Sequence, residues 1–125
     1  MKKTIINSDK LLVVGPYSAA VEAGGFIFVS GQIALDPITG EAITDIKSAT
    51  RQVLTNMQTI MEAAGLKLTN IVKTTIYLKN ITDFAVVNEV YAGFFPQEPP
   101  ARATIEVNAL PKGVPIEIEA IAARF

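Results

Sequence analysis

The stretch PPARATIEVNALPKGVPIEIEAIAARF, residues 99–125, decides how this chain folds, because it predicts two strands of alternating apolar and polar residues around a Leu-Pro-Lys-Gly turn. In the first strand, one face carries Arg102, Thr104, Glu106 and Asn108, and the other carries Ala101, Ala103, Ile105, Val107 and Ala109. In the second strand, Glu117, Glu119 and Ile121 lie opposite Ile116, Ile118, Ala120 and Ala122. We expect both apolar faces to pack against helices and both polar faces to lie on the bare side of the sheet.

Upstream of this stretch, the sequence predicts a hairpin and a helix. Residues 19–23 and 26–30 are β-prone runs separated by Gly24-Gly25, a pair that tolerates the positive φ of a tight turn. Asp45 then precedes a segment whose apolar residues recur at three- and four-residue steps, as in an amphipathic helix. The apolar stripe is Ile46, Ala49, Val53, Met57, Ile60, Met61 and Ala64, with Gly65 as the C-terminal stop.

A third strand and a second helix complete the pattern. The β-branched run IVKTTIYLK at 71–79 predicts the strand, and Thr82 or Asp83 can cap a helix that Pro96 terminates. The apolar stripe of that helix is Phe84, Val87, Tyr91 and either Phe94 or Phe95. The order β-β-α-β-α-β-β predicts one α+β two-layer domain over residues 1–125. Two helices can cover only one face of its sheet, so the other face must meet water or another subunit.

Composition and charge argue against several classes of partner. Half of the residues are hydrophobic, the formal net charge is −1, and the 11 lysines and arginines are scattered, with only Lys2-Lys3 adjacent. Such a chain has no electrostatic footprint for nucleic acid or for an anionic membrane surface. The basic N-terminus is followed by no long apolar stretch, so we expect neither a signal peptide nor a membrane anchor, and a cytoplasmic protein.

The residue types that are missing restrict the chemistry. The chain has no histidine and no cysteine, which rules out serine-histidine and cysteine-histidine nucleophiles and leaves little basis for a zinc site. Neither GxGxxG nor GxxxxGK[ST] is present, and the carboxylates lack calcium-loop spacing. We therefore expect a site without metal or cofactor, in which any proton transfer uses Glu, Asp, Tyr, Lys or water.

Two interpretations fit the arginine and the glutamates of the C-terminal strands. In the first, the polar face is solvated, or Arg102 forms a structural ion pair with one of the glutamates. In the second, Arg102 presents its planar fork to a substrate carboxylate, a bidentate match that lysine cannot copy, while a nearby glutamate holds a water. The length of the turn does not indicate whether Glu117 or Glu119 lies near the arginine.

Five segments in order give the chain a specific resemblance. They are GPYSAAV at 15–21, FVSGQI at 28–33, NEVYAGFF at 88–95, PARATIEV at 100–107 and LPKGVPIEIEAIA at 110–122. With these segments the chain resembles the reactive intermediate deaminase family, also called RidA/YjgF, over nearly its whole length. The resemblance implies a chorismate mutase-like α+β fold, a homotrimer whose sheets face a central cavity, and three active sites between subunits. It also implies hydrolysis of 2-imino acids (2-iminobutanoate, 2-iminopropanoate) to 2-keto acids and ammonia.

The resemblance also implies roles for individual residues. Arg102 of the PAR segment would bind the substrate carboxylate, and Glu117, the first glutamate of IEIE, would contact the attacking water. Tyr17, Ser30 and Gly31 would complete the pocket, with a backbone donor near Thr104. The simpler alternative is that Tyr17 only packs its ring after a Gly-Pro turn, while Ser30 and Gly31 only end a strand. In the same simpler alternative, Glu119 only balances a charge. We expect Asn88, on the apolar stripe of its helix, to cap backbone groups.

Two departures from the family pattern and two rival functions complete the prediction. Thr104 stands where many members have cysteine, which changes the polarity of the pocket, and the PQEPP segment at 96–100 is shorter than in some relatives. One rival is a regulatory module that binds small carboxylates without turnover, because an arginine clamp serves binding and catalysis equally. The other is an RNA-cleaving translation inhibitor, which the scattered lysines and the absence of histidine disfavour.

Overall fold

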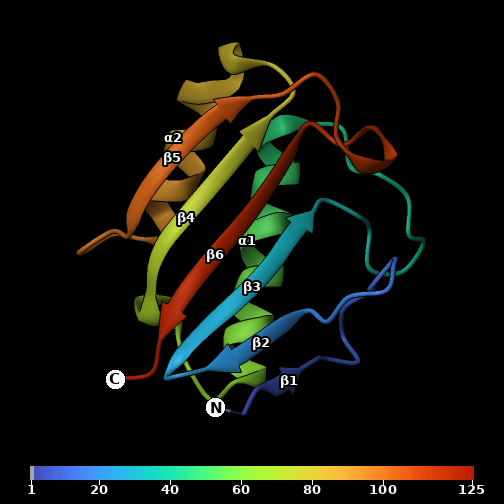
Figure 1. The fold of residues 1–125 in the computed structure, drawn as a ribbon. Helices are drawn as coiled ribbons and strands as arrows, with labels where there is room; N and C mark the ends of the chain where they lie inside the picture. The colour runs from blue at the N-terminus through green and yellow to red at the C-terminus, as the bar shows by residue number, and fades with distance from the viewer. Residues whose placement is uncertain (1) are drawn as a thin grey trace.

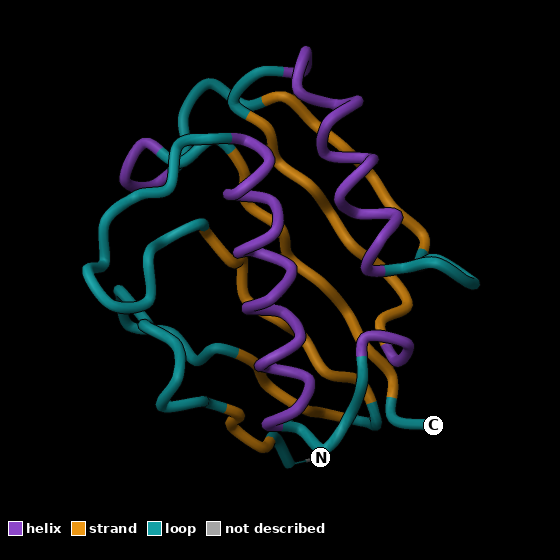
Figure 2. The backbone as a smooth tube through the Cα atoms, turned by 180° about the vertical axis from the view of Figure 1, so that it is seen from behind, coloured by secondary structure: helices purple, strands orange, loops and turns teal. Residues whose placement is uncertain are grey.

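The computed structural model describes residues 2–125 as one six-stranded sheet with two helices on one of its faces (Figures 1 and 2). The strands run in the order β1-β2-β3-β6-β4-β5 across the sheet. In chain order the elements are β1 (Thr4–Ile6), β2 (Ala20–Ala23), β3 (Phe26–Ile33), α1 (Ile46–Ala63), β4 (Ile71–Leu78), α2 (Phe84–Phe94), β5 (Ala101–Glu106) and β6 (Ile116–Ala123). The predicted α+β two-layer architecture is confirmed.

The first helix begins and ends where the sequence predicts. The Asp45 side chain accepts a hydrogen bond of 2.9 Å from the backbone N–H of Ser48, which satisfies one of the free donors at the start of α1. Gly65 follows the helix with φ of 73°, a conformation that glycine adopts without steric cost. The stripe residues Ala49, Val53, Met57, Ile60 and Met61 are fully buried against the sheet, so the helix covers the core.

The predicted hairpin is present, and it is extended by a strand that the sequence pattern did not predict. Gly24 and Gly25 have φ of 61° and 82° between β2 and β3, which pair antiparallel. The additional strand, β1, is only three residues long and pairs with β2 at the edge of the sheet. It is too short to show an alternation that could be recognised in the sequence.

The two C-terminal strands are not neighbours, because β4 lies between them. β6 pairs antiparallel with β3 and β4, whereas β5 runs parallel to β4 and forms the far edge of the sheet, beside α2 (Figure 1). In β6 the prediction of faces is confirmed: Ile116, Ile118, Ala120 and Ala122 are buried under the helices, and Glu117 and Glu119 alternate with them on the other face.

In β5 the prediction of faces is wrong. Arg102 is in register with the buried Thr74 of β4 and its side chain contacts residues of α2, so Arg102 and Thr104 lie on the helix side. Ala101, Ala103 and Ile105 lie on the bare side. The physical reason is that an edge strand has no fully buried face, and the long arginine side chain packs well against aromatic rings of the helix.

The bare face of the sheet carries large apolar side chains. Phe26 and Phe28 of β3 are each 48% exposed, and Ile105 of β5 is 46% exposed. They alternate with residues that pack under the helices, so they project from the uncovered face. An apolar surface of this kind on a sheet is typical of an interface with another chain. Neither helix of the described residues is long and apolar enough to cross a membrane.

Candidate active site

Four of the six residues assigned to a site by resemblance line one open pocket of about 340 Å³. Tyr17 comes from the loop before β2, Ser30 and Gly31 come from β3, and Glu117 comes from β6. Val14, Ile33 and Pro111 complete the lining. Segments that are about 100 residues apart in the sequence thus meet at a single cavity beside the bare face of the sheet.

An irregularity in β3 brings Ser30 and Gly31 to the glutamate. Val29 pairs with Ala120 and Gln32 pairs with Ile118, so β3 contains one more residue than β6 between these two pairs. A β-bulge of this kind redirects side chains and is common beside active sites. A Cβ atom on Gly31 would lie 2.8 Å from Cδ of Glu117 and closer still to Oε2. The carboxylate therefore occupies the space that the missing side chain of Gly31 leaves.

The loop that carries Tyr17 is tied to the bulge by hydrogen bonds. The hydroxyl of Ser30 donates to the carbonyl oxygen of Ser18 at 2.6 Å, and the backbone N–H of Ser30 donates to the carbonyl oxygen of Ala19 at 2.9 Å. The hydroxyl proton of Ser30 is thus used in a hydrogen bond within the chain, and this bond holds the loop in place. The Tyr17 side chain remains 46% exposed above the pocket.

Glu117 is the acidic residue of this pocket. Partial burial raises the pKa of its carboxyl above the ordinary value, and the negative charge of Glu119, two residues further along β6, raises it further. On the adjacent strand, burial is the main cause that raises the pKa of the Tyr77 phenol. The negative charges of Glu119 and Glu117 raise it further. Glu119 is exposed on the bare face, and it acts on Glu117 as a like charge. A carboxylate with a raised pKa in a cavity is a candidate for accepting a proton or orienting a water.

Arg102 lies apart from this pocket, in a cradle made by one face of α2. Its Nη2 donates a hydrogen bond of 2.7 Å to Oδ1 of Asn88. Its Cζ lies 4.9 Å from the ring centroid of Tyr91 and 5.5 Å from that of Phe84, within the range of cation–π attraction. Within residues 2–125 the only ion pair joins Arg124 to Glu22, so no carboxylate of the described chain neutralises Arg102.

The role predicted for Asn88 needs correction. Its side-chain oxygen accepts from Arg102 and caps no backbone group. The sequence contained a signal for this contact, because Asn88 is a polar residue between Phe84 and Tyr91 on an otherwise apolar stripe. A polar residue at such a position needs a hydrogen-bond partner. The partners predicted from the sequence were backbone groups, and the arginine of the neighbouring strand was not among them.

Thr104 shares the helix-facing side of β5 with Arg102. Its Oγ1 is buried and is the one such side-chain oxygen or nitrogen in residues 2–125 that has no hydrogen-bond partner. A buried hydroxyl without a partner costs free energy. Thr104 therefore places an unpaired hydroxyl on the same side of β5 as Arg102.

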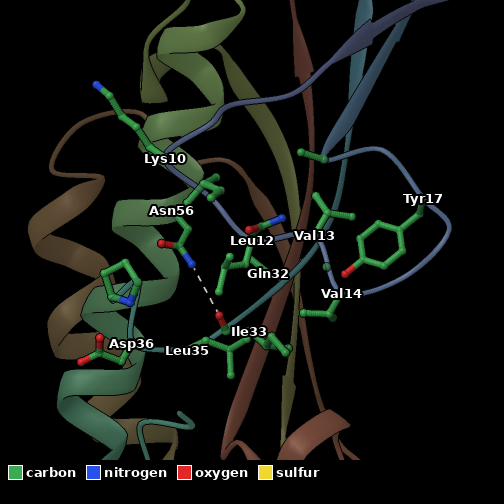
Figure 3. Close-up of a pocket in the computed structure, with 14 residues that line it drawn as sticks. Lys10, Leu12, Val13, Val14, Tyr17, Gln32, Ile33, Leu35, Asp36 and Asn56 are labelled. Atoms are coloured by element: carbon green, nitrogen blue, oxygen red, sulfur yellow. Dashed lines mark hydrogen bonds between the residues drawn. The ribbon is translucent and has the colours of Figure 1, made fainter. Parts of the chain in front are cut away.

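A second cavity, of about 30 Å³, lies next to the Glu117 pocket (Figure 3). It shares Val14, Tyr17, Gly31 and Ile33 with the Glu117 pocket. Figure 3 shows Tyr17 at one end and Asn56 of α1 at the other, where Asn56 Nδ2 donates to the carbonyl oxygen of Ile33 at 3.4 Å. The volume is enough for one or two water molecules.

The two groups of candidate residues cannot meet at one small ligand within a single chain. Glu117 lies on the bare face of β6, and Arg102 lies on the helix face of β5, with β4 between the strands. Two strand spacings amount to about 10 Å, and the sheet itself separates the two faces. The chain therefore presents two half-sites, a carboxylate beside a cavity and an arginine that forms no ion pair within the described residues. No cluster of three or more His, Cys, Asp or Glu residues within 2–125 could hold a metal ion.

Comparison with known proteins gives consistent matches over the whole chain. The family model described as endoribonuclease L-PSP matches residues 7–124. The 2-iminobutanoate/2-iminopropanoate deaminase of Escherichia coli K12 is 48% identical over 127 residues, which cover 99% of each chain. The crystal structure of the YjgF gene product of E. coli matches with a TM-score of 0.92 and 46% identity, over 98% of this chain and 99% of that one. The structure of E. coli TdcF with bound serine matches with a TM-score of 0.93 and 40% identity, over 98% and 99%.

Proposed function

This chain belongs to the RidA/YjgF family, and we propose that it is an enamine/imine deaminase that hydrolyses 2-imino acids to 2-keto acids and ammonia. The observation that carries the proposal is the pair of half-sites, because one supplies a positive fork for a carboxylate and the other supplies a carboxylate for a water. The name of the E. coli relative, which is 48% identical, states this class of substrate. The serine bound to E. coli TdcF, an α-amino acid, is likewise a small ligand with a carboxylate.

The complete site of the proposed enzyme lies between two copies of the chain. Arg102 and Thr104 of one copy face Tyr17, Ser30, Gly31 and Glu117 of the next. Two observations support this arrangement: the sheet separates the two groups within one chain, and the bare face carries exposed Phe26, Phe28 and Ile105. Burial of that face in a homotrimer, with the sheets around a central cavity, removes apolar surface from water and completes three sites at once.

The chemistry assigns one step to each half-site. Arg102 binds the carboxylate of the imino acid through two parallel hydrogen bonds, which fixes the imine carbon over the pocket. Glu117 accepts a hydrogen bond from a water whose oxygen attacks that carbon. The carbon–oxygen bond forms as the C=N double bond becomes single, and the nitrogen takes a proton. Glu117 receives a proton from the attacking water and passes it to the nitrogen of the resulting carbinolamine, so that the nitrogen has taken up a second proton. The C–N bond then breaks to release ammonia, and the hydroxyl group loses its proton to solvent as the keto acid forms. Water and imino acid thus give keto acid and ammonia.

The test is a coupled assay in which a threonine dehydratase generates the imine and the release of 2-ketobutyrate is followed. Wild type should accelerate release, and Arg102→Ala should abolish the acceleration while the oligomer survives. Arg51→Ala is the matched control, because Arg51 is exposed on α1 and lies in neither half-site. A rate for Arg102→Ala equal to that of wild type would remove this arginine from the chemistry.

Binding without turnover is the rival with the same geometry. A carboxylate-binding module would gain thermal stability from 2-ketobutyrate through Arg102 but would leave the rate of imine decay unchanged.

The family model also carries the word endoribonuclease in its description. RNA cleavage needs phosphate contacts, and this chain has a net charge of −1 and no histidine. Cleavage of single-stranded RNA that depends on Glu117 would favour that second activity over the deaminase.

A further inference from the structure

The helix side of β4 contains a buried hydrogen bond that the proposed reaction does not use. Oγ1 of Thr74 and the hydroxyl oxygen of Tyr91 lie 2.7 Å apart, and the two side chains are 1% and 5% exposed. Thr74 is the residue of β4 that pairs in register with Arg102. The strand neighbour of the arginine is thus joined directly to the aromatic residue over which the guanidinium lies.

Tyr91 is held on two sides. Its hydroxyl is fixed by Thr74, and its ring packs against Phe95 with centroids 4.6 Å apart. Burial raises the pKa of its phenol, so the hydroxyl stays protonated at neutral pH. A ring that is held at both ends presents a fixed face, and the Arg102 Cζ lies 4.9 Å from its centroid.

The surroundings of Arg102 orient the guanidinium without neutralising it. Phe84, Asn88 and Tyr91 follow one face of α2 at steps of four and three residues. Two of them offer aromatic faces and the third offers one amide oxygen. A guanidinium has five N–H donors, and the described chain engages one of them. The remaining donors are available to a carboxylate.

We infer that Tyr91, locked by its buried hydrogen bond to Thr74, is a positioning residue that sets the direction of the Arg102 fork and thereby the affinity of the site for a substrate carboxylate. This inference deepens the proposed function and rests on it for the identity of the ligand. Tyr91 itself contacts neither the substrate nor the attacking water. It acts through the arginine.

The test separates positioning from folding with paired variants. Tyr91→Phe or Thr74→Val alone leaves one buried hydroxyl without a partner and should lower stability. The double variant Tyr91→Phe/Thr74→Val removes both hydroxyls and should regain most of that stability, while the ring loses its anchor. We expect the double variant to bind 2-ketobutyrate several-fold more weakly and Tyr91→Leu, which removes the aromatic face, to bind it about tenfold more weakly. In turnover, the loss should fall on KM, with kcat changed less.

A measurement without ligand makes the outcome independent of the proposed reaction. The Nε proton of Arg102, assigned by its disappearance in Arg102→Lys, should resonate upfield in wild type because the guanidinium lies over the Tyr91 ring. In Tyr91→Leu it should move downfield, because only the ring of Phe84 remains beside the guanidinium. If wild type binds 2-ketobutyrate through Arg102 but does not hydrolyse imines, the deaminase proposal fails. The weaker binding and the shifted Arg102 resonance in the Tyr91 variants would then still support the inference. Wild-type affinity, KM and Arg102 resonance in both the double variant and Tyr91→Leu would overturn the inference.

Discussion

Gly31→Ala tests whether the position of the Glu117 carboxylate sets the rate. A Cβ on residue 31 would lie 2.8 Å from Cδ of Glu117 and closer to Oε2, whereas ordinary contacts begin at 3.4 Å. The carboxylate must therefore retreat, and because its oxygen is nearer than Cδ, the displacement of the catalytic atom is roughly 1 Å, which costs about 10²-fold in rate. The group that moves is the free end of a half-buried side chain, so the fold should persist.

The assay is kcat/KM for imine hydrolysis, measured beside thermal unfolding. Gly93→Ala is the matched control, because a Cβ there meets no atom within 4 Å and Gly93 lies in helix α2, away from both cavities. It should keep wild-type activity and gain about 1 kcal/mol of stability, the usual difference between glycine and alanine within a helix. Wild-type activity in a folded Gly31→Ala protein would show that the position of the carboxylate does not set the rate, since Glu117 would then work from a displaced position.

The remaining predictions concern the charges around the two half-sites. Glu119→Gln removes one of the two causes that raise the pKa of Glu117. The acid limb of the kcat/KM profile should lie above pH 4.5 in wild type and should move to lower pH in this variant. An unshifted limb would show that another group titrates. Because the folded-state pKa of Glu117 is raised, ionisation of its carboxyl lowers the stability of the folded protein as pH rises above 4.5. In thermal scans, Glu117→Gln should therefore be more stable than wild type at pH 7, and the difference should vanish below pH 4.5. Asn88→Asp places a carboxylate where Arg102 already donates a hydrogen bond, so KM should rise about tenfold with little loss of folding; an unchanged KM would mean that the fork need not be free.

Local signals made most of the fold predictable from the sequence. Asp45 and Gly65 mark the ends of α1 by interactions within a few residues, and the strict alternation in β6 shows which face holds Glu117. The faces of β5 were not predictable in this way. Alternation separates Arg102 from Ala103, but it does not say which of the two points to the helices when neither face of an edge strand is fully buried.

The candidate site was predictable as a set of residues but not as a geometry. The bulge that brings Gly31 to Glu117 is an irregularity of pairing between distant strands, and no short-range pattern encodes it. The contact of Asn88 with Arg102 depends on β5 returning parallel to β4 beneath α2, which is a property of the topology. Sequence alone therefore placed the arginine and the glutamates on one surface, while the structure places them on opposite faces of the sheet.

A site shared between copies is tested most directly by refolding two inactive variants, Arg102→Ala and Glu117→Gln, together. If each site takes its arginine from one copy and its glutamate from the next, random assembly at equal amounts restores both residues in about one quarter of the sites, whatever the number of subunits in the ring. We predict about 25% of wild-type imine hydrolysis in the mixture and none in either variant alone. A mixture of confirmed hetero-oligomers that stays inactive would contradict a site shared between copies.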